Sequence, residues 1–94
     1  MAQLYDSDKV RAAAQSVRAL RDNLERGVME PGRRAIRESE PLRGAAAEAM
    51  RERLQQLHRD VRQLGGELGG ICTALERYAT ALEEAGEKLT REMQ

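Results

Sequence analysis

Few side chains in this sequence are of a type that could carry out chemistry. His58 is the one histidine and Cys72 the one cysteine, so neither has the neighbouring ligands that a metal site requires. A nucleophilic Cys72 would need an adjacent base, which the sequence does not place. We interpret His58 as an ordinary residue beside the apolar stripe described below. Cys72 is interpreted as a small buried apolar residue, with an intermolecular disulfide as the alternative.

Several arginines lie close together near the middle of the chain, where they could bind the carboxylates of a substrate or a phosphate. They are Arg33, Arg34, Arg37 and Arg43. Because Glu38 and Glu40 are interleaved with them, we interpret the group as a solvated surface. No acid–base pair, glycine-rich phosphate loop or metal cluster occurs at a workable spacing. The sequence therefore predicts a protein that is not an enzyme, without catalytic residues, a metal or a cofactor.

The composition limits the fold and the kinds of partner. Of 94 residues, 40% are apolar, 34% are charged, and two tyrosines are the only aromatics. A core of Leu, Val, Ile, Met and Ala suits packing between helices. Sixteen basic and sixteen acidic residues cancel, and no apolar run approaches the length of a membrane span. We therefore expect neither a nucleic-acid partner nor a membrane span, and we also expect no ordinary signal peptide at the N-terminus.

The second half of the chain carries an apolar residue at alternating steps of four and three, broken only at the last step. This spacing places the residues on one stripe of an α-helix and excludes a strand. We predict one long helix over about residues 44–93. The stripe consists of Met50, Leu54, Leu57, Val61, Leu64, Leu68, Ile71, Leu75, Tyr78, Leu82, Ala85, Leu89 and Met93.

Four glycines interrupt this helix, at Gly65, Gly66, Gly69 and Gly70. Glycine in a helix interior costs roughly 1 kcal/mol relative to alanine, which favours a break at 65–70 and a three-helix bundle. The apolar stripe continues through the glycines in phase, which favours one continuous helix. A strip of glycines would also let another backbone approach closely. Both folds remain open, with the continuous helix preferred.

The first half predicts a shorter helix over about residues 7–38. Asp6 or Ser7 can cap its first turn, and a kink or short break is expected at Pro31-Gly32. A bend over about residues 39–44 would then join the two helices. The apolar residues of the first helix also follow steps of three and four: Val10, Ala13, Val17, Leu20 and Leu24. We predict a single all-α domain over 1–94, an antiparallel two-helix hairpin.

The two helices differ in length, which leaves apolar surface without a partner. The second helix would be about 75 Å long and the first about 48 Å, so the first would end opposite Arg77. Two such hairpins forming a four-helix bundle would cover the remaining stripe. The predicted interface comprises Val10, Val17, Leu20, Leu24, Leu54, Leu57, Val61, Leu64, Leu68, Ile71, Leu75, Tyr78, Leu82 and Leu89.

The segment Pro41–Met50 resembles the bend of the WXG-type (ESAT-like) proteins, small helical hairpins handled by type VII (ESX) secretion systems. In that family a Trp-x-Gly turn precedes small residues and then a large apolar one. Here Gly44 takes the glycine place, Ala46 is one of the small residues, Met50 is the large one, and Leu42 stands where the tryptophan would be. The chain length, the mid-chain bend and the two amphipathic helices also look like that family.

The resemblance implies a non-catalytic secretion substrate, co-secreted partner or targeting chaperone. Its partner would be a second copy, a sister WXG-like protein or the helical N-terminal domain of an LXG-type toxin. The family's export signal, Tyr-x-x-x-Asp/Glu, is approximated by Tyr78 and Glu83, one place late, and a secretion ATPase would recognise it. This implies a protein of the bacterial cytoplasm, or one exported without a leader. The alternative is a cytoplasmic structural coiled-coil dimerisation protein.

Overall fold

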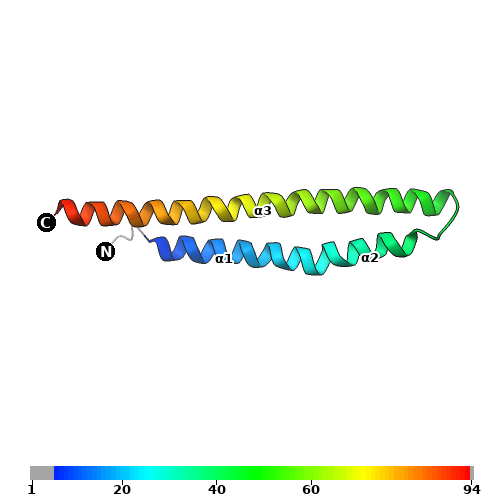
Figure 1. Ribbon diagram of the computed structural model, residues 1–94, viewed down its shortest axis with the longest axis horizontal. Coiled ribbons are helices and arrows are strands. Elements are labelled where there is room, and N and C mark those ends of the chain that lie inside the picture. Colours follow the sequence, from blue (N-terminus) through cyan, green and yellow to red (C-terminus); the bar gives the residue numbers. More distant parts are fainter. Residues whose placement is uncertain (1–5, 94) are drawn as a thin grey trace.

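The computed structural model describes residues 6–93, which form an extended antiparallel hairpin of helices (Figure 1). The elements are α1 (Ser7–Leu24), the π-helical turn η1 (Glu25–Met29), α2 (Glu30–Ser39) and α3 (Ala45–Glu92). The first three follow one another without interruption, and we call them together the first arm. The all-α hairpin with a shorter first and a longer second helix is thus confirmed. Residues 1–5 and 94 of the predicted domain lie outside the described residues.

The long helix α3 runs through all four glycines without a break, so the three-helix alternative is wrong. Two of these glycines face the first arm. A Cβ atom at Gly69 would lie 3.3 Å from Nη1 of Arg21, and one at Gly65 would lie 3.9 Å from Cδ2 of Leu24. Gly66 and Gly70 would meet nothing within 4 Å. Packing against the first arm offsets the intrinsic cost of glycine, which the sequence alone could not show.

The first arm has a π-helical turn just before Pro31-Gly32, the position at which the sequence predicted a kink or break. The backbone N–H of Glu30 donates to the carbonyl of Glu25, five residues earlier, and the helix then continues through Pro31. Proline lacks an N–H and its ring collides with the carbonyl four residues before it. A π-helical turn just before the proline changes the position of those carbonyls and keeps the arm continuous. The distortion therefore falls at 25–29, and no break occurs at Pro31-Gly32.

The bend is held by one glycine and one arginine. Gly44 has a φ of 107°, a conformation that residues with a Cβ adopt only with strain, and α3 begins directly after it. Nη2 of Arg51 donates to the carbonyls of Ser39 and Leu42, at 2.7 and 2.8 Å. The Ser39 carbonyl ends α2 and also accepts from the backbone N–H of Leu42, whereas the Leu42 carbonyl belongs to the bend. Arg51 thereby fastens α3 to the bend.

The first arm reaches further along α3 than the lengths predicted. Its end at Ser39 contacts Arg51, because the first turns of α3 lie beside the bend. Its beginning therefore lies opposite Glu83, which Arg11 contacts, and not opposite Arg77. The last turns of α3 extend past Ser7, at the end of the hairpin away from the bend (Figure 1). The hairpin measures 76 × 17 × 15 Å.

Candidate partner-binding face

The seam between the two helices is built from small side chains. The buried apolar residues among those described are Ala14, Met29, Cys72 and Ala79, and Ala79 has no exposed surface. No large side chain of the described residues is fully buried. On α3 the innermost row repeats every seven residues: Arg51, His58, Gly65, Cys72, Ala79 and Gly86. The hairpin therefore brings two backbones close together but encloses little apolar volume.

Eight of the fourteen predicted interface residues lie half-buried at this seam. On α3 they form a second row at seven-residue spacing beside the small one. They are Val10, Val17, Leu24, Leu54, Val61, Leu68, Leu75 and Leu82. This part of the predicted interface faces the chain's own other helix, so only the remaining residues are free to contact a partner.

The other six predicted interface residues are exposed. Their exposed fractions are Leu20 55%, Leu57 57%, Leu64 44%, Ile71 48%, Tyr78 57% and Leu89 44%. Met50 is similarly exposed, at 45%. Five of these residues on α3 lie seven apart, and we call them the apolar ridge: Met50, Leu57, Leu64, Ile71 and Tyr78. Side chains seven apart lie on one line along a helix, so the ridge runs for about 42 Å.

The first arm contributes apolar side chains to the same side of the hairpin. Val28 and Leu57 line one small hollow between the helices, together with Gly32 and His58. Leu20 and Ala13 are exposed on the same flank of α1, since Arg11 and Arg18 occupy the opposite flank. We call the ridge together with Ala13, Leu20 and Val28 the apolar face.

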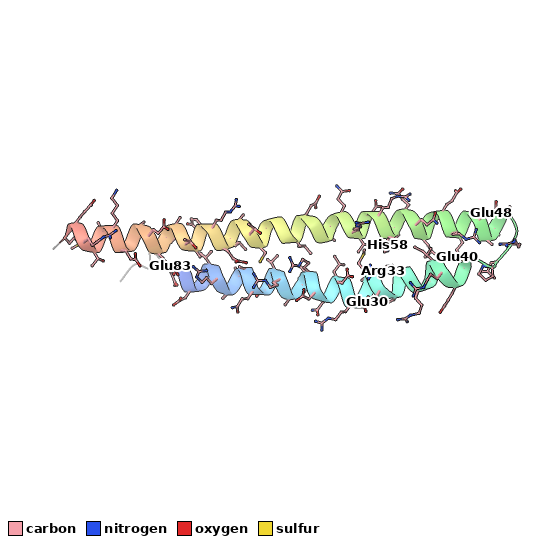
Figure 2. All side chains as sticks on the ribbon, in the orientation of Figure 1. Glu30, Arg33, Glu40, Glu48, His58 and Glu83 are labelled. Carbon is pink, nitrogen blue, oxygen red and sulfur yellow. The ribbon has the colours of Figure 1, made fainter. Side chains whose placement is uncertain are left out.

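The opposite side of the hairpin carries ion pairs. Arg11 Nη2 lies 2.6 Å from Glu83 Oε1, and Arg18 pairs with Glu76. The hydrogen bond from Arg11 and a second one from Ser7 lower the pKa of Glu83. Glu83 lies on the side of α3 that faces the first arm (Figure 2). These pairs lie along one flank of the seam and the ridge lies along the other, so the hairpin has one polar and one apolar side.

His58 and Cys72 belong to the seam. His58 is half-buried on the inner side of α3 (Figure 2), and a Cβ atom at Gly32 would lie 3.6 Å from its Nδ1. The thiol of Cys72 is buried and donates to Oε1 of Glu76 at 3.1 Å. This bond and burial raise the pKa of Cys72, which disfavours the reactive thiolate. Within residues 6–93 no three His, Cys, Asp or Glu side chains converge to hold a metal ion.

The arginines near the bend do not converge on a common site. Arg33 bonds Glu25 at 2.7 Å within the first arm. Arg43 donates to the carbonyl of Glu40 at 2.9 Å. Arg34 and Arg37 are exposed. The contacts are those of surface arginines.

The residues of the bend motif lie in different surroundings in the structure, and so do the two residues of the candidate export signal. Gly44 has the positive φ described above, Leu42 is 47% exposed, and Met50 belongs to the ridge. Ala46 is exposed. Tyr78 lies on the ridge, whereas Glu83 is bound by Arg11 on the polar side.

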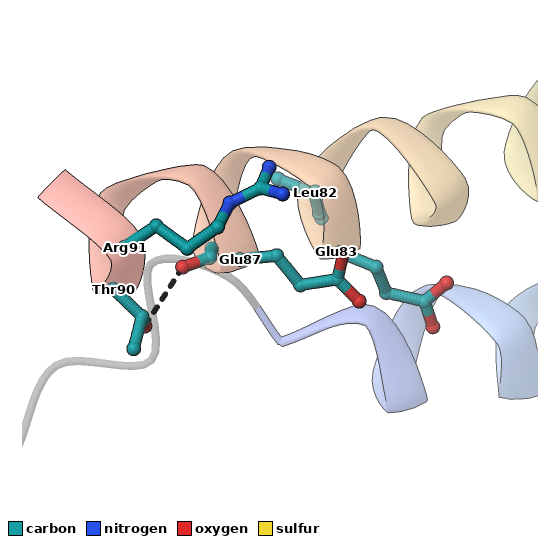
Figure 3. A pocket seen from close by; sticks show the side chains of 6 residues that line it. Leu82, Glu83, Glu87, Thr90 and Arg91 are labelled. Atoms are coloured by element: carbon teal, nitrogen blue, oxygen red, sulfur yellow. Dashed lines mark hydrogen bonds between the residues drawn. The ribbon is translucent and has the colours of Figure 1, made fainter.

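The end of α3 carries a shallow hollow close to Glu83. It is lined by Leu82, Glu83, Gly86, Glu87, Thr90 and Arg91 (Figure 3). All six residues belong to α3, and Thr90 Oγ1 donates back to the carbonyl of Gly86 at 2.9 Å. The hollow is therefore an open groove along a single helix.

Sequence reasoning found the large apolar residues but missed the small inner row. It treated the stripe of α3 as one seam, whereas the stripe divides into a half-buried row at the seam, which includes Leu54, Val61 and Leu68, and the exposed ridge. The signal was present in the seven-residue spacing of Gly65, Cys72, Ala79 and Gly86. Such small residues mark the side on which another backbone comes closest.

Comparison with known proteins gives no relative: no protein-family model, no curated protein and no solved structure matches the chain. Along residues 6–93, none of the helices combines the length and apolar character needed to cross a membrane. The fold and the site thus define an all-α hairpin with one polar and one apolar face.

Proposed function

We propose that the chain is a non-catalytic interaction module that binds another helical protein through its apolar face. This proposal rests on the exposed apolar ridge. Five large apolar side chains in line, each about half exposed, form a larger apolar surface than isolated exposed residues make. Their seven-residue spacing is the one with which side chains pack into a neighbouring helix.

We further propose that this module serves type VII secretion, as a substrate, co-secreted partner or targeting chaperone. The support is the sequence motif at the bend, with its glycine followed by alanines and then Met50, together with the hairpin layout. The partner would be a hairpin of the same kind or the helical N-terminal domain of an LXG-type toxin. The protein would reside in the bacterial cytoplasm or leave it by the leaderless route, with Tyr78 and Glu83 presented to the secretion ATPase.

The test is export from a bacterial host with a type VII system. A tagged chain is followed in cells and in culture medium, with and without the secretion ATPase. A candidate effector is followed in the same strains, with and without the chain. We expect export of the chain, the effector or both to require the ATPase, and export of the effector to require the chain.

Two variants sharpen this test. Tyr78→Ala should reduce export, whereas Arg77→Ala, which changes the adjacent exposed residue, should leave it unchanged. If neither protein is exported through the ATPase, and effector export does not depend on the chain, the secretion role is contradicted.

A cytoplasmic structural dimerisation protein is the second candidate. The observation that favours it is the heptad spacing of the ridge, which is typical of coiled coils and requires nothing of the bend. This candidate predicts pairing without ATPase-dependent export, so the same experiment separates the two functions.

A further inference from the structure

We propose that the hairpin contains a hinge near the middle of its length, where the π-helical turn of the first arm lies beside the four glycines of α3. The parts of the hairpin on either side of this level change their mutual angle, while each part keeps its own packing. Such a hinge goes beyond the proposed function, because it is a property of the free chain. Only its effect on the apolar ridge rests on that function.

The least regular segments of the two helices lie opposite each other. A Cβ atom at Gly65 would lie 3.9 Å from Cδ2 of Leu24, the residue directly before the π-helical turn η1. Gly65 also lines one hollow together with Glu25 and Met29, the first and last residues of η1. The turn is therefore level with the start of the glycine segment 65–70. Sharp kinks in helices occur mostly at prolines, at pairs of small residues such as glycine and at π-helical turns.

Polar contacts join the first arm to α3 on both sides of this level but not at it. Among the residues that the structure describes, positions 19–38 of the arm make no hydrogen bond or ion pair to α3. Each outer part of the hairpin is thus cross-linked by polar bonds, whereas packing alone holds the middle. The polar contacts are Arg11 with Glu83 and Thr80, Arg18 with Glu76, and the Cys72 thiol with the Ala14 carbonyl towards the termini, and Arg51 with Ser39 at the bend.

The packing at the hinge level leaves space on both sides of one buried side chain. Met29 is 5% exposed. It borders a hollow of about 260 Å³ on the side of Arg62 and a smaller hollow of about 60 Å³ on the side of Val28 and His58. Val61 lines both hollows. Because a close-packed interior resists deformation, this space lets the two helices tilt around Met29 and Val61 without collision.

Close contact between the helices explains only two of the four glycines. A side chain at Gly65 or Gly69 would meet the first arm, whereas a Cβ atom at Gly66 or Gly70 would meet nothing within 4 Å. Gly27, within the π-helical turn, likewise faces open space. Glycine weakens a helix more than any residue except proline. A hinge accounts for the three glycines that packing leaves unexplained, because it requires backbone freedom at that level.

The hinge divides the apolar ridge into two parts. Met50 and Leu57 lie on the side of the bend, Ile71 and Tyr78 lie on the side of the termini, and Leu64 lies at the hinge itself. A change of angle therefore alters the curvature of the ridge without altering its residues. If the ridge binds a helical protein as proposed above, the hinge lets it follow partners of different curvature.

Distances between two spin labels on α3 test the hinge directly. The labels are attached at Gln56→Cys and Glu84→Cys in a Cys72→Ser background. Both positions are exposed and would lie about 42 Å apart on a straight helix. Labelled chain is diluted with unlabelled chain, so that double electron–electron resonance reports one pair of labels. We expect a broad distribution that extends to distances shorter than the straight-helix value.

The variant Gly66→Ala/Gly70→Ala provides the comparison. Alanine meets open space at both positions and favours the helix, so the variant should fold and its distance distribution should narrow by about half. A second pair of labels, at Ala49→Cys and Gln63→Cys, spans no glycine and should give a narrow distribution in both chains. Equal widths for the wild type and the variant, measured with the pair that spans the glycines, would overturn the hinge.

Amide hydrogen exchange gives an independent measurement. In the wild-type chain, the amides of residues 64–71 and 25–29 should exchange faster than those of residues 51–60, because helices open most readily where the backbone is weakest. The double variant should slow exchange at 64–71 roughly tenfold and leave 51–60 unchanged. Uniform exchange along α3 of the wild type would contradict the hinge.

Failure of the hinge is distinguishable from failure of the proposed function. Label distances and amide exchange are measured on the chain alone, whereas the secretion role is measured as export from a host. Equal widths together with ATPase-dependent export remove the hinge and support the secretion role. A broad distribution that narrows in the double variant, in a host without such export, supports the hinge and contradicts the secretion role.

Discussion

Substituting Ala79 with leucine tests how closely the two helices approach each other. Ala79 is fully buried, on the inner row where the seam is lined by small residues. Leucine adds three carbon atoms for which the seam has no space, and such overpacking typically costs 1–3 kcal/mol. For a domain of this size, that range corresponds to a fall in melting temperature of roughly 5–20 °C.

The assay is thermal unfolding followed by circular dichroism at 222 nm. Protein concentration must be equal for all variants, because association shifts the apparent stability. Ala49→Leu is the matched control, since Ala49 is exposed on the same helix and the change in helix propensity is the same. The control should move the melting temperature by only a degree or two.

A particular result would refute the reasoning. If Ala79→Leu melts at or above the wild-type temperature while Ala49→Leu is neutral, leucine has found space at the seam. The helices would then be further apart than the structure places them, and the small inner row would not define the contact between them.

Three further predictions concern the bend, the glycines and the ion pairs. Gly44→Ala should lower the unfolding free energy by about 1–2 kcal/mol because of the positive φ at this position. Gly66→Ala should raise the unfolding free energy by up to about 1 kcal/mol, because a Cβ atom there meets open space. Urea unfolding measures both changes, and a stabilising Gly44→Ala would contradict the first prediction. Arg51→Ala should cost about 1–3 kcal/mol by removing both charge-assisted hydrogen bonds from α3 to the bend, and hydrogen exchange should show faster opening there; unchanged exchange would contradict this role of Arg51. The pKa of Glu83 is lowered in the folded chain, so its pairing with Arg11 stabilises the fold above the unfolded pKa of about 4.3. This stabilisation is lost as pH falls through the lower folded pKa. Glu83→Gln should remove that part of the acid dependence, and identical acid unfolding curves of the variant and the wild type would contradict the prediction.

Much of the fold could be predicted from the sequence because helix formation here depends on local periodicity. The steps of four and three from Met50 onward indicate a helix whatever lies beside it. Likewise, the position of Gly44 after a proline-containing turn indicates a bend. The stripe did not reveal which of its residues face the first arm and which remain exposed, since Leu57 and Val61 are equivalent in the pattern. One is exposed on the ridge, whereas the other is half-buried against the first arm.

The sequence by itself determined that this protein is helical, that it bends near its middle and that its apolar residues lie on stripes. Local spacing, caps and turn residues set these features. Only the tertiary structure decided which side of α3 turns inward, that the glycines remain helical and that the proline is accommodated by a wide turn. These outcomes depend on the approach of residues far apart in the chain, such as Arg21 to Gly69 and Arg11 to Glu83. Because the inner row and the half-buried row of α3 pack against the first arm, the ridge remains exposed.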